Sequence, residues 1–173
     1  NVAPDIAIKL GTYIAAFGDD TIRCSYRQNF LLRNIPEAYL GNIYQFLKEL
    51  EVETDTPYFV NNLVSCTGAD TCKLGICLSK GALNAVKDEM LARSGVDFGL
   101  LRDVRVNISG CPNSCGQQMV SDLGFFGRAG RNGEVYPAYN IVAGARVGGD
   151  SPRLATKIAE VNAQDMPKLT RAV

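Results

Sequence analysis

The chain contains no histidine, and this absence removes several common kinds of site. Histidine is the usual axial ligand of haem, the commonest catalytic base and the partner of cysteine in mixed zinc sites. Any metal or redox centre in this sequence must therefore be built from other side chains. Net charge is also absent, since 18 basic residues balance 18 acidic ones, and we expect no nucleic-acid partner.

Long apolar runs are missing as well. No run approaches the roughly 20 residues that span a bilayer, so we expect no membrane association. The first segment carries Asp5 and Lys9 and lacks the pattern of a secretory signal. Six cysteines among 173 residues are too sparse for a disulfide scaffold, which favours a reducing, cytoplasmic setting. The chain begins at Asn1, and we expect it to be a piece of a longer protein.

Four of the cysteines form two pairs with ligand-like spacing. Cys66 and Cys72 make a C-x₅-C pair in SCTGADTC, and Cys111 and Cys115 make a C-x₃-C pair in SGCPNSC. Both segments are rich in Gly, Pro, Asn and Asp, residues that favour loops. Sets of four thiolates bind iron–sulfur clusters or zinc. The pattern predicts a metal centre that two loops share.

The distance between the pairs in the sequence does not oppose this hypothesis. Closing the loop over residues 73–110 costs only about 3 kcal/mol, whereas a structural metal site contributes on the order of 10 kcal/mol or more. Zinc stays an alternative, although neither pair has the two-residue spacing of zinc knuckles. Unligated thiols, or a disulfide between the loops, are further alternatives. Cys24 and Cys77 are expected in the core, with Cys77 as a rival ligand.

Hydrophobic periodicity gives a coarse outline of the fold. It predicts a helix over 4–17, one bent or two short strands over 21–35, and a helix that begins near Pro36. This order is typical of half an α+β sandwich, and the polar segment TDTP at 54–57 is a candidate boundary. The elements expected beyond it are a strand over 58–65, a helix over 73–93, a strand over 104–109, strands in DLGFFGR and YNIVAGARVGG, and one or two closing helices over 154–172.

The chain resembles the C-terminal half of siroheme-dependent nitrite and sulfite reductases. The resemblance rests on the two cysteine pairs, their separation and the loop GCPNSCG. The segment TIRCSYRQN also looks like the family's R-x-T-x-x-Q-N strand, in which Arg23, Gln28 and Asn29 match and Ser25 replaces the threonine. The segments SDLGFFG and VGG further along the chain also fit the pattern of this family.

The resemblance implies an α+β fold with two domains. Residues 1–53 would form half of a ferredoxin-like (parachute) α/β sandwich, and residues 54–173 a mixed α/β siroheme and 4Fe-4S domain. It also implies ligands and contacts for both cofactors. The 4Fe-4S cluster would be held by Cys66, Cys72, Cys111 and Cys115, and the catalytic Cys115 would bridge it to the siroheme iron. Siroheme would be contacted by Arg23, Arg27, Gln28, Asn29, Ser109 and Asn113, with Arg128, Arg131 and Arg146 as weaker candidates for its carboxylates.

The implied activity is the six-electron reduction of nitrite to ammonia or of sulfite to sulfide. Electrons would come from ferredoxin or a flavoprotein, and the loop GCPNSCGQ slightly favours nitrite. Family members are pseudo-twofold repeats of this unit. We therefore expect a missing N-terminal half to supply the basic side chains that bind substrate, the chain alone to be inactive, and a homodimer to be feasible. The alternatives are a 4Fe-4S electron-transfer module without siroheme and a non-redox zinc-binding interaction domain.

Overall fold

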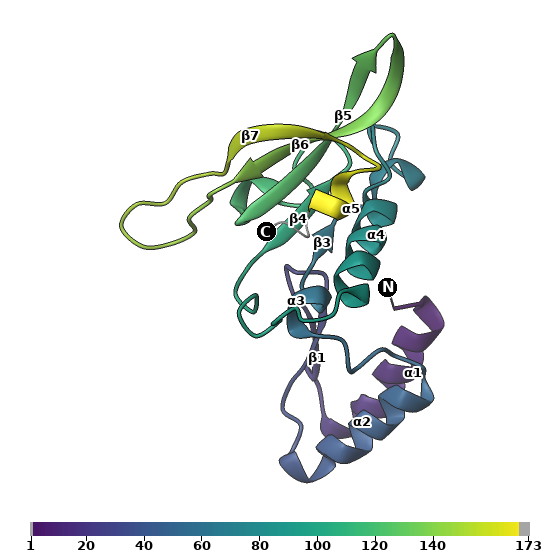
Figure 1. Cartoon of the computed structure of the whole chain (residues 1–173). Helices are drawn as coiled ribbons and strands as arrows, with labels where there is room; N and C mark the ends of the chain where they lie inside the picture. Colours follow the sequence, from purple (N-terminus) through teal and green to yellow (C-terminus); the bar gives the residue numbers. More distant parts are fainter. Residues whose placement is uncertain (1, 170–173) are drawn as a thin grey trace. The chain divides into compact units, whose positions relative to one another are not determined.

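The computed structural model describes residues 2–169 of the chain (Figure 1). It contains two compact units, Asn1–Thr56 and Pro57–Val173. The sequence predicts the division slightly earlier, between residues 53 and 54. No helix within 2–169 is both long and apolar enough to cross a membrane.

The first unit consists of two helices and a short hairpin. Helix α1 (Pro4–Ile14) continues into a 3₁₀ turn (Ala15–Phe17), and β1 (Ile22–Cys24) pairs antiparallel with β2 (Phe30–Leu32). A second 3₁₀ turn (Glu37–Tyr39) leads into α2 (Leu40–Glu49). The predicted helix over 4–17 and the alternative of two short strands over 21–35 are thus confirmed.

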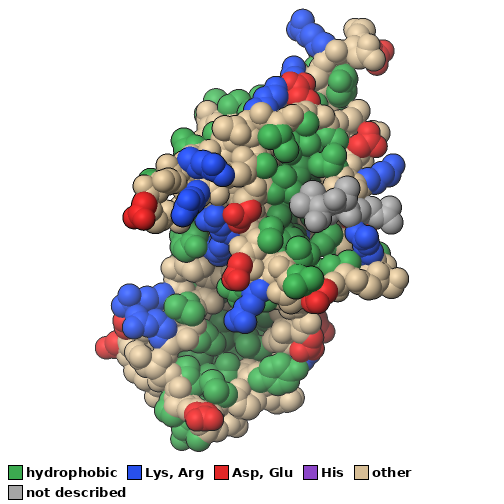
Figure 2. Space-filling model, turned by 60° about the vertical axis from the view of Figure 1, so that its left-hand side comes forward, with side chains coloured by type: hydrophobic (Ala, Val, Ile, Leu, Met, Phe, Trp, Pro, Cys, Tyr) green, Lys and Arg blue, Asp and Glu red, His purple; other side chains and the backbone are tan. Residues whose placement is uncertain are grey.

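A small apolar core joins the two helices of this unit. Leu10 and Ile14 of α1 and Ile43 of α2 are buried. The rings of Tyr13 and Phe46 stack with their centroids 4.0 Å apart. Much apolar surface stays uncovered, as the green patches over this unit in Figure 2 show. The exposed large side chains of the unit are Val2, Ile8, Tyr26, Phe30, Leu31, Tyr39, Leu40 and Tyr44.

The second unit is built on a five-stranded sheet with the order β3-β4-β5-β6-β7. Strand β4 pairs in parallel with β3 and with β5, whereas β6 pairs antiparallel with β5 and with β7. Their bounds are β3 (Val64–Ser65), β4 (Val106–Ser109), β5 (Leu123–Asn132), β6 (Glu134–Ala143) and β7 (Thr156–Asn162). The predicted strands at 104–109, in DLGFFGR and in YNIVAGARVGG are confirmed.

Three helices complete the second unit: α3 (Tyr58–Asn61), α4 (Ser79–Ala92) and α5 (Met166–Leu169). Helix α4 packs on the sheet through Val86 and Met90, which share one core with Ile108 of β4 and Phe125 of β5. All four residues of β4 are buried, as expected for a strand paired on both sides. This rigid centre positions the segments that follow β3 and β4.

Three predicted elements differ from the structure. Residues 58–65 hold helix α3 before the short strand β3, because the amides of Asn61 and Asn62 donate to the carbonyls of Pro57 and Tyr58. The predicted helix over 73–93 begins only at Ser79. The segment before it turns instead, because its amides bond to another loop, as described below.

The predicted closing helices over 154–172 are also wrong for the most part. Residues 156–162 form β7, which pairs along β6 with a register shift between Ile141 and Val142. Pairing with a neighbouring strand outweighs local helix propensity here. Only α5 is helical, and residues 170–172 lie outside the described part of the chain.

Candidate metal centre

The two cysteine loops follow adjacent parallel strands. Cys66 comes directly after β3, and Gly110 and Cys111 come directly after β4. Carboxyl ends of parallel strands lie at one edge of a sheet, where α/β proteins commonly bind ligands. The ladder continues past β3, since the amide of Cys66 donates to the carbonyl of Ile108 at 3.0 Å. The fold therefore brings the two predicted loops to the same place.

Direct hydrogen bonds join the loops. The amide of Gly110 donates to Cys66 Sγ at 3.1 Å. The amides of Ile76 and Cys77 both donate to the carbonyl oxygen of Gly110, each at 2.9 Å. The first loop therefore closes around the start of the second, which is why residues 73–78 cannot be helical.

Glycines make this contact possible. A Cβ atom on Gly110 would lie 2.7 Å from the carbonyl oxygen of Cys77 and 3.0 Å from Cα of Gly68. Gly68 itself has a φ of +70°, a conformation that side chains disfavour. On the other side of Gly110, a Cβ on Gly127 would lie 2.3 Å from its carbonyl oxygen. Backbone packs on backbone at this point, so no side chain fits.

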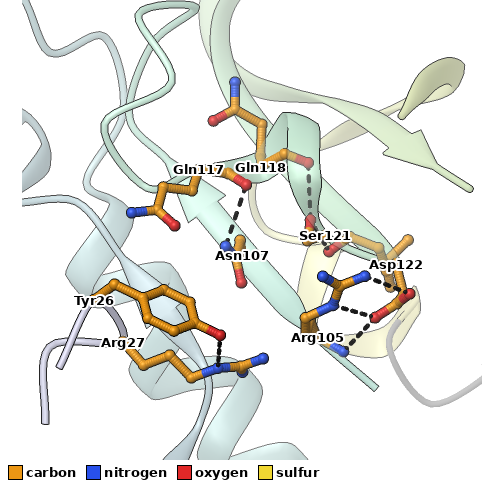
Figure 3. A network of polar contacts seen from close by, with 9 residues as sticks. Tyr26, Arg27, Arg105, Asn107, Gln117, Gln118, Ser121 and Asp122 are labelled. Atoms are coloured by element: carbon orange, nitrogen blue, oxygen red, sulfur yellow. Dashed lines mark hydrogen bonds and ion pairs between the residues drawn. The ribbon is translucent and has the colours of Figure 1, made fainter. Parts of the chain in front are cut away.

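The second cysteine loop is held by buried polar groups. Ser109 Oγ donates to Gln118 Oε1 at 2.5 Å and accepts from the amide of Gly116 at 2.9 Å. Asn107 Nδ2 donates to the carbonyl of Gln117 at 3.2 Å, as Figure 3 shows. These hydrogen bonds from β4 side chains therefore fix the backbone conformation of the second cysteine loop.

An ion pair joins the start of β4 to the start of the next strand, β5. The guanidinium of Arg105 donates to both carboxylate oxygens of Asp122, at 2.9 and 3.1 Å, and the Arg105 amide adds a third bond at 2.8 Å (Figure 3). These bonds lower the pKa of Asp122 below its ordinary value. Arg105 precedes β4 and Asp122 precedes β5, so the pair fixes the parallel register of these two strands at the end of β4 away from its cysteine loop.

All six cysteines are free thiols, so the structure contains no disulfide between the loops. Cys111 is buried, Cys66 and Cys72 are half-buried, and Cys115 is exposed. The remaining two cysteines differ from each other. Cys77 is buried as predicted, and its thiol faces the carbonyls of Arg128 and Ala138, at 3.8 and 3.4 Å, while burial raises its pKa. Cys24 is exposed, contrary to the predicted core position, because the two-stranded hairpin gives it no covering layer.

A zinc ion and a 4Fe-4S cluster require different spacings between their cysteine thiolates. Within residues 2–169, no group of three or more His, Cys, Asp and Glu side chains is arranged to hold a metal ion. Thiolates around one zinc lie about 3.8 Å apart, given Zn–S bonds of about 2.3 Å. A cubane places four irons between its thiolates and holds them farther apart. The four free cysteines stand on two contacting, glycine-lined loops, and the chemistry of this donor set fits a 4Fe-4S cluster.

The predicted siroheme contacts near the N-terminus belong to the first unit, whereas the two cysteine pairs belong to the second. Gln28 and Asn29 lie in the turn between β1 and β2, where Gln28 has a φ of 62°. Arg23 forms two bonds with the carboxylate of Asp20, which lower the pKa of that acid. Arg27 Nε donates to the hydroxyl of Tyr26 at 3.3 Å (Figure 3).

The other predicted contacts lie in the second unit. Ser109 is buried and its hydroxyl is already used inside the unit, whereas Asn113 is exposed on the second cysteine loop. Arg128 forms an ion pair with Glu160, and Arg131 is exposed on the β5–β6 hairpin. Arg146 lines an open groove of about 300 Å³ on the connection from β6 to β7, together with Val120, Val147, Gly148, Pro152, Arg153 and Leu154.

One residue at the centre of the site gave no signal in the sequence. Ser79 is fully buried, and its Oγ lies 3.2 Å from Cys66 Sγ and 2.9 Å from the carbonyl oxygen of Cys66. A serine at the start of a helix is normally interpreted as a cap. Only the three-dimensional contact of α4 with the first loop reveals its position.

These features define a class of protein, one with two paired-cysteine loops in contact at the carboxyl edge of a mixed sheet. Comparison with known proteins agrees with this class. A family model described as "Nitrite and sulphite reductase 4Fe-4S domain" matches residues 59–173, and one described as "Nitrite/Sulfite reductase ferredoxin-like half domain" matches residues 1–50. The chain belongs to the nitrite and sulfite reductase family, a family of oxidoreductases whose membership implies a 4Fe-4S cluster and a siroheme.

Individual relatives are similar over most of the chain. It is 28% identical to ferredoxin–nitrite reductase of Synechococcus elongatus and 33% identical to the chloroplastic ferredoxin–nitrite reductase of Betula pendula, over 90% and 87% of its length. It is 28% identical to the ferredoxin-type sulfite reductase of Mycobacterium tuberculosis over 87%. The chain spans 30%, 26% and 28% of these relatives, less than a third of each.

A solved structure supports the fold. The NirA protein of Mycobacterium tuberculosis superposes with a TM-score of 0.77 over 95% of this chain and 32% of its own, at 23% identity. Together with the family models, this likeness confirms the predicted fold class, half of a ferredoxin-like sandwich followed by a mixed α/β domain.

Proposed function

We propose that this chain supplies the 4Fe-4S site and one side of the siroheme site of a nitrite or sulfite reductase. The observation that carries the proposal is the contact between the cysteine loops, above all the bond from the Gly110 amide to Cys66 Sγ. A bound cluster explains why two glycine-lined loops, each with a pair of cysteines, lie together at one edge of the sheet. The proposal assigns residues 1–53 to the half-domain and residues 54–173 to the cofactor domain.

In this proposal Cys66, Cys72, Cys111 and Cys115 hold the cluster. Cys115 is the exposed one of the four, which suits a second role as the ligand of the siroheme iron. The cofactors, when bound, would relay electrons from an external donor to nitrite or sulfite. The chain itself fixes the thiolates in place, through the Gly110 amide and through the Ser109 hydroxyl under the second loop.

Siroheme recognition is proposed for the polar side chains that the resemblance singles out. Arg23, Arg27, Gln28 and Asn29 lie on and beside the β1–β2 turn, and Asn113 is exposed beside Cys115. The guanidinium groups suit the carboxylates of the macrocycle. For Ser109 we propose an indirect role, because its hydroxyl already bonds to Gln118 and Gly116.

The rest of the reductase is proposed to complete the site. The chain spans less than a third of its relatives, and the exposed apolar side chains of the first unit suit a surface that packs against a missing N-terminal half or a second copy. We propose ferredoxin as electron donor, a flavoprotein being the alternative, because the relatives carry ferredoxin in their names. Relatives of both substrate classes occur, and the loop GCPNSCGQ favours nitrite. We further propose a reducing, cytoplasmic setting, which suits the free thiols.

The experiment that tests this function is anaerobic loading of the chain with iron, sulfide and siroheme. We expect visible bands of siroheme and, in electron paramagnetic resonance, a coupling between the two centres. Cys115→Ser should abolish the coupling, whereas Cys24→Ser, which removes an exposed thiol from the other unit, should leave it intact. The loaded chain should not turn over nitrite or sulfite alone. Siroheme that fails to bind a cluster-loaded chain would refute the siroheme part.

That last outcome would favour a second function, a 4Fe-4S electron-transfer module. The supporting observation is that two predicted siroheme contacts already have partners, since Arg23 pairs with Asp20 and Ser109 bonds to Gln118. A cluster needs neither group. A cluster-loaded chain that exchanges electrons with ferredoxin and binds no siroheme would establish this alternative.

A further inference from the structure

Ser79 occupies the point where the first cysteine loop, the second cysteine loop and helix α4 meet. Its side chain is fully buried. Its Oγ lies 3.2 Å from Cys66 Sγ, and a Cβ on Gly68 would lie only 2.5 Å from it. On the other side, a Cβ on Gly110 would lie 3.6 Å away. The glycines of both loops leave room for this one hydroxyl.

The hydroxyl does not serve its own helix. Ser79 is the first residue of α4, and the residue that precedes it, Leu78, has no side chain that caps the helix. A serine near a helix start usually accepts a bond from the backbone of that helix. Ser79 instead directs its Oγ to Cys66, both to the carbonyl oxygen at 2.9 Å and to the sulfur at 3.2 Å.

Ligation of Cys66 to a metal changes which atoms can accept the hydroxyl hydrogen of Ser79. A hydroxyl has one hydrogen to donate, and here two acceptors of the same residue compete for it. A free thiol carries its own hydrogen and can donate to Ser79 Oγ. A thiolate bound to iron has none, so it can only accept. The bound sulfur, which also accepts from the Gly110 amide at 3.1 Å, then becomes an acceptor for the Ser79 hydrogen at 3.2 Å, in competition with the Cys66 carbonyl oxygen.

We propose that Ser79 is a positioning residue that donates to the Cys66 thiolate and raises the reduction potential of the cluster. This inference rests on the proposed cluster site. Reduction adds an electron to a centre that is already negative, and part of this charge falls on the cysteine sulfurs. A hydrogen-bond donor on a sulfur stabilises the reduced form more than the oxidised form.

The test is a redox titration of the cluster in the full chain, followed by electron paramagnetic resonance. Ser79→Ala should retain the cluster and shift its midpoint potential to a more negative value. Ser79→Thr keeps the hydroxyl and should restore the potential of the unsubstituted chain. The matched control is Ser121→Ala, which also deletes a fully buried serine hydroxyl, one whose hydrogen is shared between the carbonyl oxygens of Gln118 and Leu123, at 2.8 and 3.0 Å. This control should leave the potential unchanged.

The outcomes separate the two proposals. A chain that binds no cluster would overturn the proposed function and this inference with it. A bound cluster whose potential is the same with and without the Ser79 hydroxyl would overturn this inference alone. If Ser79→Ala does not fold, Ser79→Gly decides, because it removes the same hydroxyl and introduces no new ligand beside Cys66. A negative shift in that variant supports the role of Ser79, and an equal potential contradicts it.

Discussion

Gly110 shows how a residue without a side chain shapes the site. Its amide bonds to Cys66 Sγ, and its carbonyl accepts from Ile76 and Cys77. Every polar group that it has therefore connects one cysteine loop with the other. The position tolerates no Cβ, since the nearest atoms are backbone atoms of Cys77 and Gly68. Backbone atoms cannot rotate away as the end of a flexible side chain can.

We therefore predict that Gly110→Ala separates the loops. The substitution should destabilise the second unit by about 1–3 kcal/mol, the usual cost of overpacking, and the chain should lose its capacity for a cluster. Gly11→Ala is the matched control, because a Cβ at this helical position meets no atom within 4 Å. It should stabilise the first unit by roughly 0.5–1 kcal/mol. Urea titration measures both changes, and a Gly110→Ala chain as stable as the parent would show that the loops are not packed in this way.

At the scale of elements, the sheet was predictable where its strands carry their own pattern. The alternation in 104–109 and the glycine turn after Asn132 predict β4 and the β5–β6 hairpin directly. β7 was not predictable, since residues 156–162 are strand only because β6 offers them a partner. The start of α4 was missed for a similar reason. Apolar residues at helical spacing extend back to Leu74. The amides of Ile76 and Cys77, however, donate to the carbonyl oxygen of Gly110, so they form no helical hydrogen bonds.

The parallel pairing of β4 and β5 gives a prediction on pH. The bonds from Arg105 lower the folded-state pKa of Asp122 below the ordinary value of 3.8. A lowered acid pKa contributes stability that is present above 3.8 and is lost as the pH falls through the lower, folded value. Asp122→Asn should therefore cost up to about 1 kcal/mol at neutral pH, as expected for a partly exposed pair. The difference from the parent chain should disappear in acid.

Denaturation midpoints between pH 7 and pH 2 measure this dependence. The control is Asp103→Asn, which changes an exposed aspartate just before the same strand. It should alter the midpoint little at any pH. A difference between Asp122→Asn and the parent that stays constant down to the lowest pH would contradict the role of the ion pair.

At the scale of the whole molecule, the sequence predicted the fold class and the two loops that carry the paired cysteines, but not the contacts around those loops. The cysteine spacing located both loops, because ligand spacing is a local property of the chain. The role of Ser79 was not predictable, because the distance of its hydroxyl from Cys66 Sγ depends on where α4 packs. The arrangement of Arg23 was equally hidden, since nothing in the sequence shows that Asp20 pairs with it. The first feature depends on the packing of α4 against the first cysteine loop, and the second on the local conformation of the chain before β1.

The central claim is that the two loops hold one cluster between them, and iron and sulfide analysis after anaerobic reconstitution tests it most directly. The account predicts one 4Fe-4S cluster for each chain. Cys111→Ser, at a buried position in the second loop, should lose the cluster, while Cys24→Ser should keep it. A parent chain that takes up zinc and no iron, or a Cys111→Ser chain that holds its cluster as firmly as the parent, would contradict the account.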